Sequence, residues 1–196
     1  MIRTHANDCR RSNMHIAPTA LPGVFVAAST SVGDHRGAFS RLFCARELAD
    51  ILGERRIVQI NHSRTLAQGT VRGLHYQRPP KTEMKLIRCL KGRVWDVAVD
   101  LRAGSPTFLR WHAEELSPLN ARMMVIPEGC AHGFQALEGE SEMLYLHTAF
   151  YDDEVERGVG CEDPRLAIDW PLPISDLSVR DRSFAPLAAD FAGIAV

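Results

Sequence analysis

The stretch Met123-Met-Val-Ile-Pro-Glu-Gly-Cys-Ala-His-Gly-Phe-Gln-Ala-Leu-Glu-Gly-Glu-Ser-Glu-Met-Leu-Tyr-Leu-His-Thr148 contains three short apolar runs separated by turn residues. The runs cover 123–126, 133–137 and 143–148, and Pro127-Glu-Gly129 and Glu138-Gly139 end the first two. Apolar runs of this length, about 8–12 residues apart with turn signals between them, are typical of an all-β sandwich or barrel.

Other segments extend this pattern toward the N-terminus. The further strand candidates are Val24–Val26, a strand through residue 75, Lys85–Leu90 and Arg93–Leu101. One helix is expected over Ala45–Leu52, because Leu48, Ile51 and Leu52 follow helical spacing. No regular alternation of strands and helices and no glycine-rich phosphate loop is present, which argues against a nucleotide-binding α/β fold. The prediction is a mainly β barrel with a few short helices at its ends.

Strand alternation assigns several polar side chains to defined faces. Because successive side chains point to opposite faces, His75 lies opposite Leu74 and Tyr76. On the same reasoning Lys85 shares a face with Ile87 and Cys89, Asp96 with Val94, Ala98 and Asp100, and Tyr145 with Met143 and His147. Alternation does not say which face points inward. If these polar groups line a barrel interior, their burial is costly unless they are paired or used.

Composition narrows the class of protein. The 196 residues suit one domain, and 23 Lys+Arg against 24 Asp+Glu argue against a dedicated nucleic-acid binder. No apolar run is long enough to cross a membrane, and the polar start lacks the apolar stretch of a signal peptide. Five widely spaced cysteines without a Cys-x-x-Cys pair favour reduced thiols. These features together predict a cytoplasmic protein.

Taken singly, the polar residues have ordinary interpretations: a lone His75 is more often structural, and Tyr145 is more often core. A metal site is the first alternative, because Pro-x-Gly-x-x-His, ending at His132, is a pattern of cupin barrels. Metal-binding cupins also need a His-x-His pair, a carboxylate and a further histidine. Here only His75 and His132 remain, with Glu83 as a possible third ligand, so no metal site is predicted.

Six motifs in fixed order are more specific than any single residue. They are Val71-Arg-Gly-Leu-His-Tyr-Gln77, Lys85-Leu-Ile-Arg-Cys89, Asp96-Val-Ala-Val-Asp-Leu-Arg102, Gly104-Ser-Pro-Thr-Phe108, Ile126-Pro-Glu-Gly-Cys-Ala-His-Gly-Phe134 and Ile168-Asp-Trp-Pro171. Together they resemble the dTDP-4-dehydrorhamnose 3,5-epimerase family, the dTDP-sugar epimerases of the cupin class. The resemblance covers residues 21–187, leaving 1–20 as an N-terminal extension and 188–196 as a tail. It implies a cupin-type jelly-roll barrel.

The resemblance also implies a reaction that needs no cofactor. Members invert C3 and C5 of dTDP-4-dehydro-6-deoxy-D-glucose to give dTDP-4-dehydro-L-rhamnose. Both carbons lie next to the C4 ketone, so a base can remove either proton through an enolate, and an acid on the opposite face can return a proton with inversion. The implied partner is therefore a dTDP-linked 4-keto-6-deoxyhexose.

The family's roles transfer to matching positions. His75 resembles the general base, Asp181 the carboxylate that orients it, Lys85 the cation beside the enolate oxygen, and Tyr145 the acid on the opposite face. Residues implied in substrate binding are Arg36 and Arg72 for the diphosphate, Gln59 and Asn61 for the sugar or nucleotide, Tyr151 for thymine stacking, and Asp96 and His132 around Lys85. The resemblance further implies a homodimer, with Arg36 reaching the ligand across the interface.

Two departures bear on specificity: Arg41 stands where some members carry glutamate, and Cys130 replaces a usual aromatic residue. The nearest alternative is a relative that inverts one centre only, because it would use His75 and Tyr145 as well. A metal-dependent cupin oxygenase and a non-catalytic nucleotide-sugar binding module are more distant alternatives.

Overall fold

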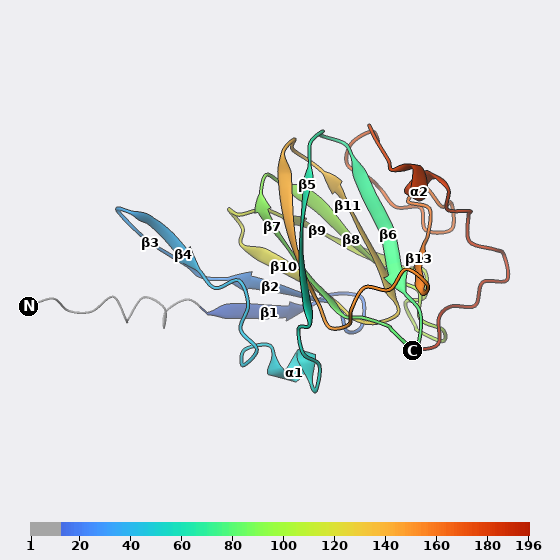
Figure 1. Cartoon of the computed structure of the whole chain (residues 1–196), viewed down its shortest axis with the longest axis horizontal. Coiled ribbons are helices and arrows are strands. Elements are labelled where there is room, and N and C mark those ends of the chain that lie inside the picture. Colours follow the sequence, from blue (N-terminus) through green and yellow to red (C-terminus); the bar gives the residue numbers. More distant parts are fainter. Residues whose placement is uncertain (1–12) are drawn as a thin grey trace, which may run out of the picture.

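The computed structural model describes residues 13–196 and consists mainly of two antiparallel sheets that face each other (Figure 1). The six-stranded sheet has the order β1 (Met14–Pro18), β2 (Phe25–Ser29), β10 (Arg122–Ile126), β7 (Lys85–Lys91), β12 (Ser141–His147) and β5 (Gln59–Thr65). The five-stranded sheet has the order β13 (Glu156–Gly158), β6 (Val71–Gln77), β11 (Cys130–Ala136), β8 (Val94–Asp100) and β9 (Trp111–Leu116). This mainly β jelly-roll architecture confirms the predicted fold class.

The main core lies between the sheets. Ile87 and Met143 from the six-stranded sheet pack in one cluster with Val94, Ala98 and Phe134 from the five-stranded sheet. Apolar clusters also cover the outer faces, where Leu86 and Leu146 lie on one sheet and Val97 on the other. The face assignments for β7, β8 and β12 are confirmed, because the predicted partners fall in the same clusters.

Every predicted strand is present with shifted ends, and the structure adds strands that the pattern did not separate. The strand expected at Val24–Val26 is β2, at Phe25–Ser29. Its neighbour β1 lies within the segment assigned to the N-terminal extension, and it pairs with β2 along its whole length. A tight turn connects β3 (Ser31–Asp34) and β4 (Gly37–Ser40), which form a hairpin that projects from the barrel (Figure 1).

The helix predicted over Ala45–Leu52 is shorter than expected. Only α1 (Ala49–Leu52) is helical, and residues 45–48 form a turn. The apolar spacing is nevertheless used, because Leu48 and Leu52 are both buried against the six-stranded sheet. The turn is tied down by Glu47, whose carboxylate accepts a hydrogen bond from the Met14 amide at 2.7 Å. Tertiary contacts thus replace the first helical turn. The segment that follows the last strand contains the second short helix, α2 (Val179–Arg182).

Close approach of β6 and β11 depends on Gly73. Its φ is +122°, and a Cβ there would lie 2.5 Å from the Cα of Gly133. Both values exclude a larger side chain without displacement of the backbone. The two strands therefore pair closely, with His75 opposite His132 in the register.

The remaining predictions concern membrane spans, cysteines and domain boundaries. Within residues 13–196, no helix has the length and apolar character to cross a membrane. Cys44, Cys89, Cys130 and Cys161 are free thiols, the last three of them buried, whereas Cys9 lies outside the described residues. The domain boundaries at 20/21 and 187/188 stay predictions.

Candidate active site

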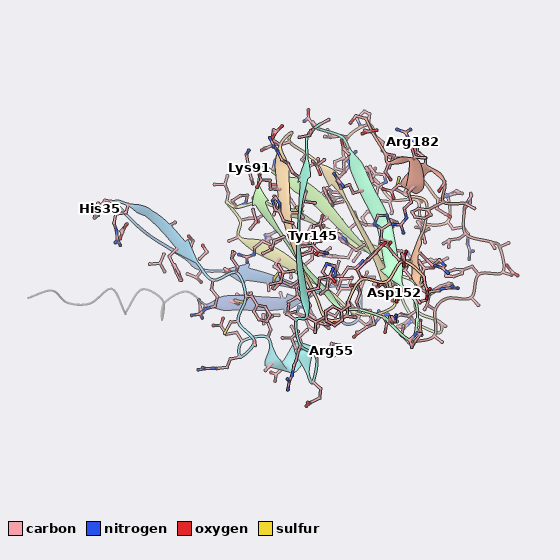
Figure 2. The ribbon with its side chains drawn as sticks, in the orientation of Figure 1. His35, Arg55, Lys91, Tyr145, Asp152 and Arg182 are labelled. Atoms are coloured by element: carbon pink, nitrogen blue, oxygen red, sulfur yellow. The ribbon has the colours of Figure 1, made fainter. Side chains whose placement is uncertain are left out.

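A cavity of about 490 Å³ opens between the sheets and collects most of the predicted site residues. Its lining includes Gln59, Asn61, Arg72, His75, Lys85, His132, Tyr145, Tyr151 and Asp181. Figure 2 places Tyr145 within the barrel. Asp96 lies behind His132 rather than in the lining, and Arg36 lies elsewhere. The base, the cation and the acid predicted from the sequence therefore share one cavity.

His75 is held by a carboxylate from the C-terminal segment. Its Nε2 donates to Asp181 Oδ1 at 2.7 Å, which leaves the lone pair on Nδ1. Asp181 lies in α2, and Ser178 caps this helix because its Oγ accepts a hydrogen bond from the Asp181 amide at 3.0 Å. The Asp181 side chain is 4% exposed and that of His75 is 27% exposed. The imidazole is thus accessible, while its orienting partner is not.

The charge state of Asp181 suits this orienting role. Burial opposes its ionisation, but hydrogen bonds from His75, the Gly73 amide and Ser178 outweigh burial and hold the pKa of the carboxyl below its usual value. A carboxylate at this position can fix the imidazole tautomer and could stabilise an imidazolium there.

Tyr145 comes from the opposite sheet. Its hydroxyl shares a hydrogen bond of 2.9 Å with Ser63 Oγ on β5. Burial raises the pKa of Tyr145 above its usual value, against a smaller lowering by the Ser63 contact. The phenol therefore keeps its proton at neutral pH and can act as a donor. Ser63 was not identified from the sequence, since its pairing with Tyr145 depends on the register of β5 and β12.

Lys85 lies on β7, in the same sheet as Tyr145, and its side chain is 10% exposed. Its Nζ donates to the backbone oxygen of His75 at 3.1 Å and lies 3.2 Å from Glu83 Oε1. An ammonium group in this position faces the same cavity as His75 and Tyr145 and can stabilise an oxyanion formed there.

Behind Lys85 lies a second histidine–carboxylate pair. His132 Nε2 donates to Asp96 Oδ1 at 2.7 Å, and Asp96 Oδ2 has no partner among the described residues. Burial raises the pKa of the Asp96 carboxyl and lowers that of His132, so both directions disfavour a charged pair. This agrees with the predicted location near Lys85 and argues against His132 as a base.

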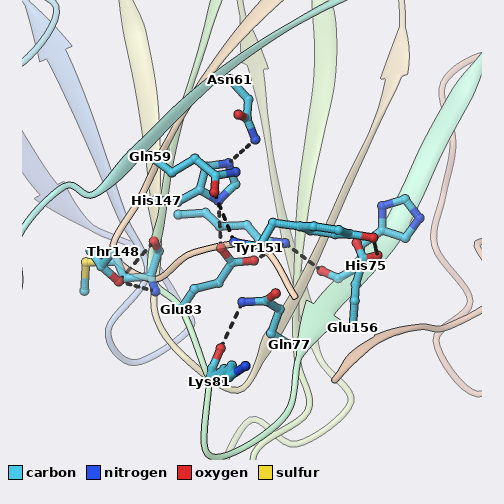
Figure 3. A network of polar contacts seen from close by, with 12 residues as sticks. Gln59, Asn61, His75, Gln77, Lys81, Glu83, His147, Thr148, Tyr151 and Glu156 are labelled. Atoms are coloured by element: carbon cyan, nitrogen blue, oxygen red, sulfur yellow. Dashed lines mark hydrogen bonds and ion pairs between the residues drawn. The ribbon is translucent and has the colours of Figure 1, made fainter. Parts of the chain in front are cut away.

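Glu83 and His147 form a third pair, which Figure 3 shows, and Glu83 lies against Lys85. His147 Nδ1 donates to Glu83 Oε2 at 2.7 Å, and Asn61 Nδ2 donates to His147 Nε2 at 3.4 Å. The His147 ring lies nearly parallel to that of Tyr145, with centroids 6.2 Å apart. From the sequence, Glu83 was only a candidate metal ligand, and His147 was placed only on the face of Tyr145. Two-residue spacing also relates Glu83 to Lys85, and this was the available signal for the pair.

The mouth of the cavity carries the residues predicted to bind the nucleotide. Tyr151 donates from its hydroxyl to Glu156 at 2.9 Å, and the Gln59 side-chain oxygen accepts from the Tyr151 amide at 3.1 Å. Arg180 forms an ion pair with the same Glu156 carboxylate. Arg72 lines the same cavity from the other end of β5, where it donates to Thr65 Oγ1 at 3.0 Å. The predicted aromatic and cationic groups therefore share one cavity but lie at different ends of β5.

Arg36 is the predicted binding residue that the chain does not bring to its own cavity. It lies in the turn of the β3–β4 hairpin, next to His35, which Figure 2 shows far from Tyr145. Its guanidinium pairs with Asp34 on the same hairpin. The assignment of Arg36 to substrate binding therefore stays a prediction that requires a second subunit.

The candidate metal ligands are used for other contacts. His75 bonds Asp181, His132 bonds Asp96, and Glu83 bonds His147 and Lys85. Within residues 13–196 no group of three or more His, Cys, Asp or Glu side chains is arranged to hold a metal ion. The donor set therefore gives no support to the metal-dependent oxygenase alternative.

Comparisons with known proteins agree with this geometry. Residues 18–189 match the model of the dTDP-4-dehydrorhamnose 3,5-epimerase family. A dTDP-4-dehydrorhamnose 3,5-epimerase from Pseudomonas aeruginosa is 46% identical over 83% of this chain and 90% of its own. A Streptomyces niveus protein named dTDP-4-dehydrorhamnose 3-epimerase is 37% identical over 89% and 84%. A 3,5-epimerase structure from Legionella pneumophila, in complex with dTDP-4-keto-L-rhamnose, superposes with a TM-score of 0.83 at 41% identity, covering 88% of this chain and 92% of that one.

Proposed function

The chain belongs to the dTDP-4-dehydrorhamnose 3,5-epimerase family, and we propose that it inverts C3 and C5 of dTDP-4-dehydro-6-deoxy-D-glucose. The observation that carries this proposal is that His75 and Tyr145, from facing sheets, line one cavity with Lys85. A base and an acid on opposite sides of a sugar ring, with a cation at the carbonyl, are what inversion next to a ketone requires.

In the proposed mechanism, His75 removes the proton from C3 or C5 and Asp181 stabilises the resulting imidazolium. Lys85 stabilises the negative charge on O4, and Tyr145 delivers a proton to the opposite face of the carbon. The phenol suits this step because burial raises its pKa and keeps it protonated until the enolate forms. Proton transfer and charge stabilisation complete the chemistry, so no redox cofactor takes part.

Binding of the dTDP group is proposed for the mouth of the cavity. Arg72 suits the diphosphate, because a guanidinium can form paired hydrogen bonds with phosphate oxygens. Tyr151, with 54% of its surface exposed, can stack on thymine, while Gln59 and Asn61 supply amides for the sugar or nucleotide.

The test is an NMR experiment in heavy water with dTDP-4-dehydro-6-deoxy-D-glucose. We expect deuterium at both C3 and C5 and inverted configuration at both. Exchange at one carbon alone would instead support a single-centre epimerase, the second candidate, which the similarity to the Streptomyces niveus 3-epimerase favours. Absence of exchange at either carbon would contradict both.

We also propose a homodimer located in the cytoplasm. The projecting hairpin exposes 46% of Phe39, and the edge strand β5 exposes 61% of Ile60, so both present apolar surface to a second copy. Such an interface would bring Arg36 toward a neighbouring cavity. Sedimentation should show a dimer, and Arg36→Ala should raise the KM by about tenfold, as expected for the loss of one charged phosphate contact. A fully active monomer would contradict this arrangement.

A further inference from the structure

The Glu83–His147 pair lines the cavity, and the proposed mechanism gives it no role. Its carboxylate is almost fully enclosed, with a side chain 7% exposed. Burial opposes ionisation of Glu83, but the His147 hydrogen bond and the charge of Lys85 outweigh it and lower the pKa of the carboxyl. A buried carboxylate therefore lies 3.2 Å from the cation that faces the substrate.

The contacts of Lys85 define what this carboxylate does. An ammonium group has three N–H donors, and among the described residues the contacts of Lys85 Nζ are the His75 backbone oxygen and Glu83. These contacts account for two donors, so the third remains for a ligand oxygen. Because both protein partners are themselves anchored, the direction of the third donor is fixed as well.

His147 supplies the anchor for Glu83. It donates to Oε2, while Lys85 lies against Oε1, so each carboxylate oxygen has its own partner. The other ring nitrogen of His147, Nε2, accepts a hydrogen bond from Asn61 on β5. The face of the His147 ring stacks on the ring of Tyr145. The same small network thus touches both the cation and the proposed acid.

We propose that Glu83, braced by His147, is a positioning residue that keeps the Lys85 ammonium directed at the ketone oxygen of the substrate. This inference rests on the proposed function and adds to it a residue that acts through Lys85 without touching the reacting carbons. Without the negative charge of Glu83, the buried Lys85 ammonium loses its carboxylate partner. It should then be less well aligned with O4 when that oxygen becomes negative.

The test is Glu83→Gln, which keeps the size and hydrogen-bonding capacity of the side chain and removes its charge. Asn61 and His147 can reverse their donor roles to accommodate an amide, so the fold should be retained. We expect deuterium exchange at C3 and C5 to slow by about 10- to 100-fold, in keeping with the strength of a charge-assisted hydrogen bond. The Kd for dTDP should change less than about twofold, because the nucleotide binds at the mouth.

A double-mutant cycle tests whether Glu83 acts through Lys85. In a Lys85→Met background, Glu83→Gln should lower the residual exchange rate by less than about twofold. Equal losses in both backgrounds would overturn the proposal, as would a parallel loss of dTDP affinity and rate in the single variant. If Lys85→Met shows no detectable exchange, the Glu83→Gln variant alone decides the question. A slower exchange with an unchanged Kd for dTDP supports the proposal, and an equal loss of both contradicts it.

The matched control is Glu114→Gln on β9. It alters another histidine–glutamate contact, in which His112 Nε2 lies 3.4 Å from Glu114, away from the cavity lining. Its exchange rate should equal that of the wild type. If Glu83→Gln does not fold, His147→Gln carries the same test, with a slower exchange and unchanged dTDP binding expected. An active wild type with an unaffected Glu83→Gln variant overturns this inference alone, whereas an inactive wild type overturns the proposed function as well.

Discussion

Two histidine–carboxylate pairs in this cavity have the same contact and different surroundings. His75 bonds Asp181 and His132 bonds Asp96, each at 2.7 Å. Asp181 also accepts from the Gly73 amide, whereas Asp96 is fully buried with one oxygen unpartnered among the described residues. Hydrogen bonding to the carboxylate lowers the pKa of Asp181, and burial raises that of Asp96.

The difference shows that the environment decides the capability of a pair. The His75 pair combines an accessible imidazole with a stabilised carboxylate, so it can accept a proton and hold the charge. The His132 pair is enclosed and its pKa values shift against charge, so it suits a fixed hydrogen-bonded support. The following predictions test that contrast.

The largest expected effect separates the two histidines. His75→Asn should reduce turnover by about 1,000-fold, because general-base catalysis contributes on the order of 100- to 10,000-fold. The dTDP affinity should be kept, since the proposed nucleotide-binding residues are separate from the base. His132→Asn should cost no more than about tenfold. The measurements are turnover by NMR and dTDP binding by calorimetry, and equal losses for the two variants would refute the contrast.

A smaller effect should separate the two carboxylates. Asp181→Asn should slow turnover by about 100-fold, because an amide cannot stabilise the imidazolium and can favour the wrong tautomer. Asp96→Asn should change turnover by less than about fivefold, since the ionised form of Asp96 is already disfavoured. Steady-state kinetics of both variants provide the comparison. A larger loss for the Asp96 variant would reverse the assignment.

The smallest effect concerns stability and compares Asp96 with Asp100 on the same face of β8. Burial opposes ionisation of Asp100, but hydrogen bonds from Arg102, Ser105 and Thr107 lower its pKa to about 2. A lowered pKa stabilises the folded state above the unfolded value, and this contribution disappears as pH falls from about 4 to about 2. Asp100→Asn should therefore reduce the free energy of unfolding by about 2 kcal/mol at pH 7.

Urea unfolding of wild type and Asp100→Asn between pH 7 and pH 2 measures this contribution. The difference in free energy of unfolding should narrow below about pH 4, as Asp100 becomes protonated in the unfolded chain. Asp96→Asn is the matched control on the same strand. If the difference in free energy of unfolding between wild type and Asp100→Asn stayed constant down to pH 2, the lowered pKa of Asp100 would not contribute to stability.

The sequence by itself determined the central strands β6, β7, β8, β10, β11 and β12, and the grouping of side chains on them. Two-residue periodicity correctly grouped Lys85 with Ile87, and Asp96 with Ala98, because a strand turns each side chain by a fixed half-turn. The order of the six motifs further predicted the family, and most of the site residues that this resemblance implied line the cavity. These inferences depend only on local geometry and on spacing along the chain.

Only the tertiary structure decided which faces point inward and which distant residues meet. Apolar clusters cover both faces of each sheet, so alternation alone carries no signal for the inside. His75 meets Asp181 across 106 positions, and Glu83 meets His147 across 64. Such pairings are set by how the sheets and the C-terminal segment pack, where buried polar groups must find partners, and no local pattern encodes them.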